Sequence, residues 1–243
     1  MYNKVQGEMT NILDKIEQEY DIKYPEIYRQ LYDNNMLDWG KTDVNWHNTT
    51  YPALKKNPPL LLFGNDFEIL DFDNIKNQIE AFKDPDDYRK ISPDFKFIPF
   101  AQTAGGDLYA FQFDKQHGEE IPIVLLYHDD ENAEILAKNF QDFIFRQLLE
   151  IVTVIDEYSR FAEDGEIKEN LSNLYRTHKD YLTENQQSIV KEIYDRELFA
   201  YKYKVPAGME YAANGLLTDI ELNSILQKEI GFEELNATFI YMG

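Results

Sequence analysis

The sequence predicts an α+β fold, in which an antiparallel-rich sheet is flanked by helices and followed by a mainly helical C-terminal extension. Three observations predict this class. Short apolar runs separated by turn residues fill 97–127, which is typical of consecutive strands. Apolar residues repeat at helical spacing before and after that stretch. The chain has 243 residues, including 17 Tyr and 16 Phe, so it can bury a full core.

Two helices are expected first, over about 6–20 and 25–35. Pro25 suits the first turn of the second helix, because the amide hydrogen that proline lacks would have no partner there. In each segment the apolar residues recur every three or four positions and therefore share one face. These residues are Met9, Ile12, Leu13, Ile16 and Tyr20 in the first helix, and Ile27, Tyr28, Leu31 and Tyr32 in the second.

Residues 38–59 are rich in proline and polar side chains, and we expect an irregular loop there. Its two tryptophans, Trp39 and Trp46, are interpreted as lids on the core in preference to interface contacts. The apolar run Leu60–Phe63 predicts a short strand that stops at Gly64, and Phe67–Leu70 predicts another.

A further helix is expected over 73–82, where Ile75, Ile79 and Phe82 recur at helical spacing, and Asp84–Asp87 breaks it. Three strands should follow, Phe97–Phe100, Leu108–Phe113 and Ile121–Tyr127, with the last two forming a hairpin.

The corner between the first two of these strands reads Gly105-Gly106-Asp107. Glycine permits a positive φ at such a corner, and we expect Asp107 to accept hydrogen bonds from local backbone N–H groups. This structural interpretation is favoured over a direct partner-binding role for the turn.

The longest amphipathic helix is expected over 139–159. Its apolar residues extend beyond one face, so we expect the sheet to cover one side and the rest of the chain to cover the other. On this basis 1–157 forms an α+β domain, and 158–243 forms a helical extension packed on it.

Two start signals support helices in the extension. Thr183 with Gln186, and Thr218 with Glu221, have the spacing of a capping box ahead of apolar residues. Gly231 is a plausible stop for the second of these helices. Residues Ala237–Met242 are predicted to be extended.

Five segments occur in a fixed order in the first part of the chain: Tyr24–Tyr28, Phe97–Ala101, Gly105–Phe111, Pro122–Val124 and Asn139–Phe143. With these segments the chain resembles, over roughly 1–157, the SUKH superfamily, which includes yeast regulators of cell-wall glucan synthesis and many bacterial immunity proteins. One departure is Trp39-Gly40-Lys41, where the family often shows an aromatic residue before a glycine pair. The family-signature residues that the resemblance implies are Pro25, Trp39, Gly40, Pro99, Gly105, Gly106 and Asp107.

The formal charge of −21 is spread over the whole chain. Residues 1–157 carry 30 acidic and 15 basic side chains, and 158–243 carry 15 and 9. Such a field repels nucleic acid and anionic membranes and attracts a basic partner. Plain solubility is the alternative interpretation of the charge.

The sequence shows no pattern of a reaction centre. It has no cysteine, and its four histidines, His47, His117, His128 and His178, share no motif. No metalloprotease, hydrolase-elbow or phosphate-loop motif is present. We therefore expect no enzyme activity, no cofactor and no bound metal. The N-terminus lacks the apolar core of a signal peptide and no apolar stretch approaches the ~20 residues of a membrane span, so we expect a cytoplasmic protein.

The resemblance and the charge together suggest a non-enzymatic, protein-binding immunity protein that neutralises a basic toxin, for example a nuclease. The alternatives are a regulatory scaffold of the glucan-synthesis type and an uncharacterised enzyme. The carboxylates expected to contact the partner lie in two segments: Asp84, Asp86 and Asp87 in one, and Asp129, Asp130 and Glu131 in the other.

Overall fold

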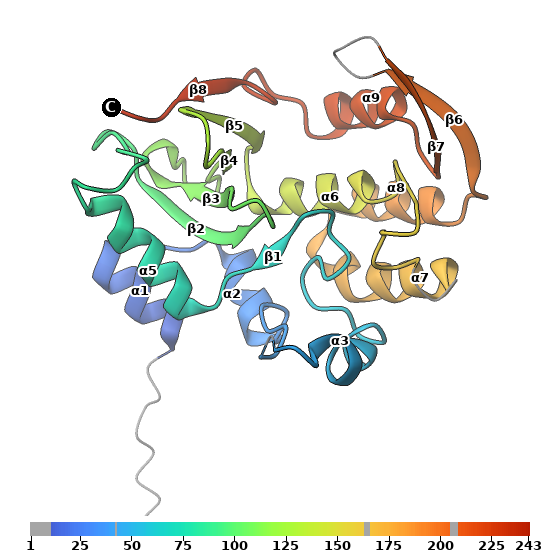
Figure 1. The fold of residues 1–243 in the computed structure, drawn as a ribbon, viewed down its shortest axis with the longest axis horizontal. Helices are drawn as coiled ribbons and strands as arrows, with labels where there is room; N and C mark the ends of the chain where they lie inside the picture. Colours follow the sequence, from blue (N-terminus) through green and yellow to red (C-terminus); the bar gives the residue numbers. More distant parts are fainter. Residues whose placement is uncertain (1–10, 42, 163–165, 205–208) are drawn as a thin grey trace, which may run out of the picture.

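A six-stranded antiparallel sheet forms the centre of the molecule, with helices packed around it (Figure 1). The computed structural model describes residues 11–41, 43–162, 166–204 and 209–243. The strand order is β1-β2-β3-β4-β5-β8. The strands of this sheet are β1 (Glu68–Ile69), β2 (Phe97–Gln102), β3 (Leu108–Gln112), β4 (Ile123–Leu126), β5 (Asn132–Ala137) and β8 (Thr238–Ile240).

Strands β2 to β5 form a meander whose centre is buried on both faces. All five residues of β3 are buried, and Phe111 lies opposite Ile98 on one side and Ile123 on the other. Pro99 occupies a strand between two neighbours, which is unusual because proline cannot donate to the ladder. The register shifts between Pro99 and Ala101, so the proline lies at a bulge.

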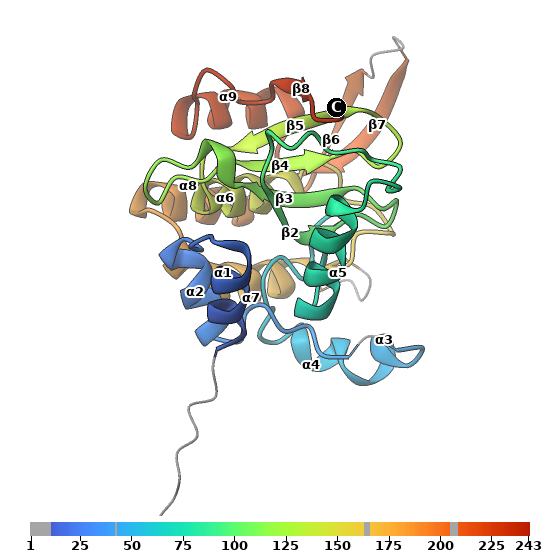
Figure 2. The same ribbon diagram turned by 90° about the vertical axis from the view of Figure 1, so that its left-hand side faces the viewer.

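The first helices pack on the side of the sheet where β2 lies, as Figure 2 shows for α1, α2 and α5. Each of α1, α5 and α6 begins with an Asn or Asp side chain that accepts a hydrogen bond from a backbone N–H of the first turn. The bounds are α1 (Ile12–Tyr20), α2 (Glu26–Asp33), α3 (Trp46–Thr49), α4 (Tyr51–Leu54), α5 (Phe72–Lys83) and α6 (Phe140–Glu150), with the 3₁₀ turn η1 (Phe113–Lys115) after β3.

Aromatic rings join α2, the sheet and α6 into one core. Tyr28 contacts Phe111 and Phe140 with ring centroids 5.2 and 5.3 Å apart, and Phe100 lies 5.1 Å from Phe140. These are edge-on geometries, in which the positive edge of one ring meets the negative face of the next.

The chain beyond α6 adds helices, a hairpin and the last strand of the sheet. Strand β8 pairs with β5 and so covers an edge that would otherwise be open. The hairpin of β6 and β7 is separate from the main sheet. The bounds are α7 (Ile167–His178), η2 (Lys179–Tyr181), α8 (Glu184–Tyr194), β6 (Phe199–Lys204), β7 (Glu210–Gly215) and α9 (Asp219–Glu229).

Hydrogen bonds cross the predicted boundary at residue 157. The Tyr194 hydroxyl donates to the Leu148 carbonyl at 2.8 Å, and the Gln186 amide donates to Asp142 at 2.8 Å. Every residue of α6 except Gln141 and Glu150 is buried. The boundary itself stays a prediction, since these contacts do not show whether either part folds alone.

The predicted α+β class is confirmed, and so are most of the predicted elements. The helices over 25–35 and 73–82 correspond to α2 and α5, and the three central strands are β2, β3 and β4. The capping box of Thr183 and Gln186 is present in full at the start of α8, and Thr218 caps α9. Positions 6–10 of the first predicted helix lie outside the described residues.

Three predictions about local structure were wrong, and some strands were not predicted. The run Leu60–Phe63 forms turns instead of a strand, and Leu61 has a φ of +49°. The expected loop over 38–59 contains the two short helices α3 and α4. Strand β5 and the β6–β7 hairpin were not foreseen.

The third error is the length of the helix expected over 139–159, which ends at Glu150. The next residues, Ile151–Ile155, are all β-branched, and such side chains lose rotamer freedom in a helix. Their backbone pairs with the end of β7 instead: the Leu216 N–H donates to the Val152 carbonyl at 2.9 Å, and the Ile155 N–H to the Asn214 carbonyl at 2.7 Å.

Candidate functional site

The Gly105-Gly106-Asp107 corner is a tight turn between β2 and β3. The Gly106 N–H donates to the Thr103 carbonyl at 3.1 Å, and the Thr103 N–H donates to the Asp107 carbonyl at 2.9 Å. Gly106 has a φ of +102°, a conformation that residues with a Cβ rarely adopt. Gly106 therefore has the positive φ that we expected glycine to permit at this corner.

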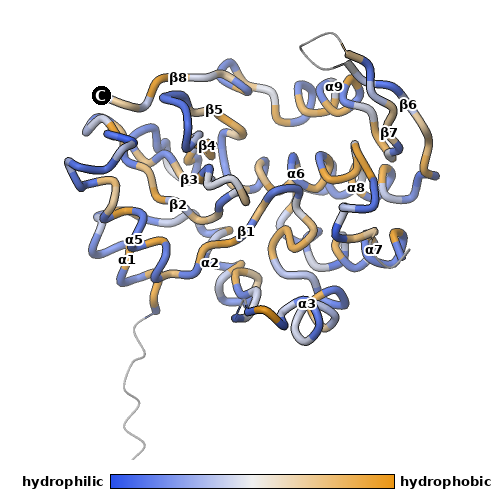
Figure 3. Tube along the Cα trace, in the orientation of Figure 1, coloured by the Kyte–Doolittle hydropathy of each residue, from blue (hydrophilic) through white to orange (hydrophobic). Residues whose placement is uncertain are grey.

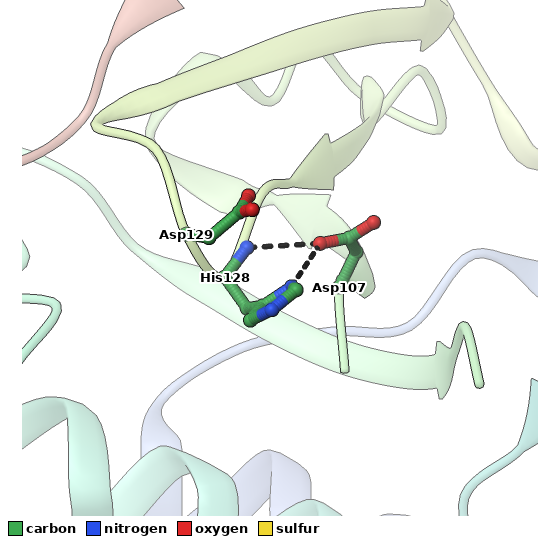
Figure 4. A group of neighbouring side chains, drawn as sticks. All are labelled: Asp107, His128 and Asp129. Atoms are coloured by element: carbon green, nitrogen blue, oxygen red, sulfur yellow. Dashed lines mark hydrogen bonds and ion pairs between the residues drawn. The ribbon is translucent and has the colours of Figure 1, made fainter. Parts of the chain in front are cut away.

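Asp107 connects this turn to the distant turn between β4 and β5 (Figure 4). One carboxylate oxygen accepts hydrogen bonds from the His128 backbone N–H at 2.9 Å and from its ring Nδ1 at 2.7 Å. The bond to Asp107 raises the pKa of His128. We expected acceptance from N–H groups of the same turn, but the bonded N–H comes from 21 residues later in the chain.

The same corner holds ligand-type atoms of Asp107, His128 and Asp129 within 4.8 Å of one another. Figure 4 shows Asp129 beside the other two without an interaction drawn to them. A metal on His128 Nδ1 would have to displace the bond to Asp107. The expectation of no bound metal stays a prediction, and this corner is the place to test it.

The positive φ predicts unequal effects of alanine at the two adjacent glycines. Gly106→Ala should lower the free energy of unfolding by roughly 1–3 kcal/mol through backbone strain. Gly105→Ala is the matched control, because its φ lies outside the positive range and its added Cβ would come no closer than 3.6 Å to Thr103. Urea unfolding measures both values. Equal losses at the two positions would contradict the role of Gly106.

The C-terminal residues link the loops that carry the two predicted acidic segments, because they form hydrogen bonds with both loops. On one side, the Ser92 N–H donates to the Tyr241 carbonyl and the Gly243 N–H to the Lys90 carbonyl, both at 2.9 Å. On the other, the Tyr241 N–H donates to the Glu131 carbonyl at 3.0 Å. The Tyr241 hydroxyl completes the link by donating to the Tyr127 carbonyl at 2.8 Å.

We name this surface the acidic end; it comprises the loop 84–92, the turns 103–107 and 127–132, and residues 240–243. In Figure 1 the C-terminus lies beside the loop that follows α5. Figure 3 shows hydrophilic residues along the turn between β4 and β5. Carboxylates separated by about 40 positions in the sequence are thereby held at one end of the sheet.

In the turn between β4 and β5 the carboxylates face solvent. Asp129, Asp130 and Glu131 are all exposed. Asp130 accepts a hydrogen bond from the Asn132 amide at 2.8 Å, and no ion pair involves these three residues among the described residues. They are free to meet a cation on another molecule.

In the loop after α5 the three aspartates differ. Asp84 and Asp86 are exposed, and Asp84 accepts the Asp86 N–H at 2.9 Å in a local turn. Asp87 instead forms a two-pronged ion pair with Arg89, at 2.8 and 2.7 Å, and only 11% of its side chain is exposed. Arg89 lowers the pKa of Asp87. Asp87 thus stabilises the loop through its ion pair with Arg89, whereas the carboxylates of Asp84 and Asp86 are exposed to solvent.

Two exposed apolar residues at the acidic end had no signal in the sequence pattern. Tyr88 is 61% exposed and Ile240 is 57% exposed. Large apolar and aromatic side chains beside charged ones are common at interface hot spots. The sequence could not place Ile240 in this surface, because its position depends on the pairing of β8 with β5 beside the turn 127–132.

The other family-signature residues have structural positions. Pro25 precedes α2 as its buried N-cap residue. Trp39 is buried, and its indole N–H donates to the Leu60 carbonyl at 3.1 Å. Gly40 has a φ of +72°, and Pro99 lies at the bulge in β2. Trp46 is also buried, with its indole N–H on the Trp39 carbonyl at 2.9 Å, which fits the lid interpretation of both tryptophans.

A family model described as the SMI1 / KNR4 family (SUKH-1) matches residues 10–146. The chain belongs to the SMI1/KNR4 family. The SMI1/KNR4 match includes the sheet from β1 to β5 and ends within α6, so the described elements from α7 onward lie outside it. Comparisons with curated proteins and with solved structures gave no match. Among the described residues, no helix has the length and apolar character needed to cross a bilayer.

Proposed function

We propose that this SMI1/KNR4-family chain is a non-catalytic binding protein that neutralises a basic toxin, and that the acidic end is its contact surface. The observation that carries the proposal is that Tyr241 forms hydrogen bonds with both loops that carry the exposed acidic residues. Family membership supports a SUKH-type domain, and the charge of −21 supports a basic partner.

The acidic end has the composition expected of such a surface. Tyr88 follows Asp84 and Asp86 in one loop, and Ile240 pairs with Asn132, the residue after Glu131. Strands β2 to β5 hold the turns 103–107 and 127–132 at fixed positions. Charged residues at the rim of an interface act mostly on the association rate, while buried apolar contacts at its centre set the lifetime of the complex. Both kinds of residue are present here.

Charge reversal at the acidic turn tests the proposal. Replacing Asp129, Asp130 and Glu131 with lysine should slow association with the partner about tenfold or more and should change dissociation little. The matched control reverses Asp33, Glu166 and Glu169, which are exposed carboxylates on or next to α2 and α7, and changes the net charge equally.

The partner for this test is the protein encoded next to the gene for this chain, captured by pull-down. Surface plasmon resonance at low and high salt gives both rate constants. Exposed charges are screened with a Debye length of about 8 Å at physiological salt, so association should also slow as salt rises. An association rate that is the same in the native chain, the acidic-turn variant and high salt would refute the acidic end as contact surface.

The alternative, a regulatory scaffold, predicts a different outcome in the same system. A neutralising protein abolishes the partner's activity at a stoichiometric ratio, whereas a scaffold binds the partner and leaves that activity unchanged. Titrating the captured partner with this chain separates the two roles.

A further inference from the structure

We propose that the groove between α7 and α8 is an anion-binding site for a small molecule that carries two or more phosphate groups. The groove lies in the part of the chain after the family match and has a volume of about 390 Å³. It is independent of the acidic end. The residues that line it are Lys168, Ser172, Tyr175, Arg176, Lys179, Lys191, Tyr194 and Asp195.

Helical spacing brings these side chains to one place. Lys168, Ser172, Tyr175 and Lys179 follow one another at intervals of four, three and four residues along α7 and into η2, so they share one face. On α8, Lys191 and Asp195 are four residues apart and also share a face. The two helices pack against each other.

The charge of the groove is opposite to that of the chain. The whole chain has 45 acidic and 24 basic side chains, whereas the groove is lined by four basic side chains and one acidic. Asp195 is paired with Lys191 at 2.5 Å. The other three cations have no carboxylate of the groove as a partner.

Two of those cations are held in place by neutral groups. Arg176 donates to the Lys56 carbonyl at 2.5 Å and to the Asn57 side chain at 3.1 Å. Lys168 donates to the carbonyl of Tyr194, the last residue of α8, and to that of Arg196 just beyond it. Within the part of the chain that the structure describes, its one ion pair is with Glu197, which is 3.9 Å away and 95% exposed. These bonds fix the cations without neutralising them.

Lys179 is the cation that most directly indicates a ligand. Its side chain is partly buried and lines the groove, and no partner for its ammonium group is found among the described residues. Like charges near one another repel. A bound polyanion removes this repulsion and gives each cation a charge-assisted hydrogen bond.

Phosphate groups fit this lining better than an uncharged ligand does. Arginine and lysine bind phosphate oxygens, and the exposed hydroxyl of Ser172 adds a further donor. The chain's remaining carboxylates oppose the approach of any anion. At physiological salt, charges more than about 8 Å away are largely screened, so the cations that touch the ligand decide the outcome.

The test measures binding of inorganic pyrophosphate and of ATP by isothermal titration calorimetry, with adenosine as the uncharged probe. We expect saturable binding of pyrophosphate and ATP and none of adenosine. Lys179→Glu should weaken the binding at least tenfold, and Lys179→Arg should retain it within about threefold. The matched control is Lys228→Glu on α9, a lysine that is 79% exposed, which makes the same charge change and should alter the affinity less than twofold.

Two outcomes would overturn the site. One is no saturable binding of either phosphate compound to the native chain at millimolar concentration. The other is an equal loss of affinity in Lys179→Glu and Lys228→Glu, which would show a response to net charge alone. Far-UV circular dichroism of each variant confirms that α7 and α8 are intact, so a loss of affinity at Lys179 reports on the groove.

Discussion

A fragment that ends at residue 157 should lose about 5 kcal/mol or more of unfolding free energy relative to the full chain, or fail to unfold cooperatively. Helix α6 packs on the sheet side against β5 and α2 and on the other side against α8 and α9. Its residues Ile144, Phe145, Leu148 and Leu149 are fully buried. Exposing one large apolar side chain costs about 1.5–3 kcal/mol, so exposing a few consumes most of a typical stability of 5–15 kcal/mol.

The truncation also opens the edge of the sheet. Without β8, the outer hydrogen-bonding groups of β5 lose their partners, and an open edge promotes association between molecules. Thermal unfolding, dye binding to exposed apolar surface and light scattering measure the two effects. A chain lacking only 238–243 is the control, because it opens the edge and keeps α8 on α6. A fragment 1–157 as stable and as monomeric as the full chain would show that the extension is a separate unit.

The central sheet could be predicted from the sequence because its signals are local. The Gly105–Gly106 corner and the apolar runs on either side of it define β2 and β3 without reference to the rest of the chain. The helix starts at Thr183 and Thr218 are equally local, since a cap needs only a side chain and a backbone N–H three residues away.

The failures involve segments whose structure depends on distant partners. The run Leu60–Phe63 is buried, and its backbone bonds to distant partners: the Leu61 N–H donates to His178 of α7, and the Leu60 N–H to the Met36 carbonyl. The β-branched run Ile151–Ile155 leaves the helix to pair with the end of β7, about 60 residues later. Five residues separate β6 from β7, so the sequence lacks the two-residue signal, such as Asn-Gly, that identifies hairpins.

The candidate surface shows the same limit. The carboxylates of the acidic end were named from the sequence, but their proximity was not, because it depends on Tyr241 bridging two loops. The sequence also gave no sign that Asp87 is occupied by Arg89 while Asp84 and Asp86 remain exposed. Composition led us to expect a basic partner, and the contact surface that we propose for it could be located only from the fold.

The fold also reveals a role for His178 that the sequence did not indicate. The burial of this residue predicts a large effect of pH on the stability of the protein. Its ring is completely buried, and Nε2 accepts the Leu61 N–H at 3.0 Å. Nδ1 lies 2.9 Å from the Leu174 carbonyl and donates to it, so the imidazole is neutral. Burial lowers the pKa of His178 to about 4, against an ordinary value of 6.5.

The sign of the effect follows from that difference. In the unfolded chain His178 takes up a proton as the pH falls below about 6.5, whereas in the folded chain it stays neutral until about pH 4. The stability it contributes is therefore complete above the unfolded pKa and is lost as the pH falls through the folded one. At 1.36 kcal/mol per unit of pKa, the loss is about 3 kcal/mol.

Many carboxylates also titrate in this pH range. Comparing the pH dependence of the unfolding free energy between variants separates the contribution of His178 from theirs. His178→Gln removes the titration and keeps a side chain with one donor and one acceptor. Its unfolding free energy should lie below that of the native chain at pH 7.5, and the gap should narrow by about 3 kcal/mol between pH 7 and pH 4. His117→Gln, on an exposed turn, should follow the native profile. A gap that stays constant with pH would mean that His178 takes up its proton at the same pH in the folded and unfolded chains, and it would contradict the neutral ring that accepts the Leu61 N–H.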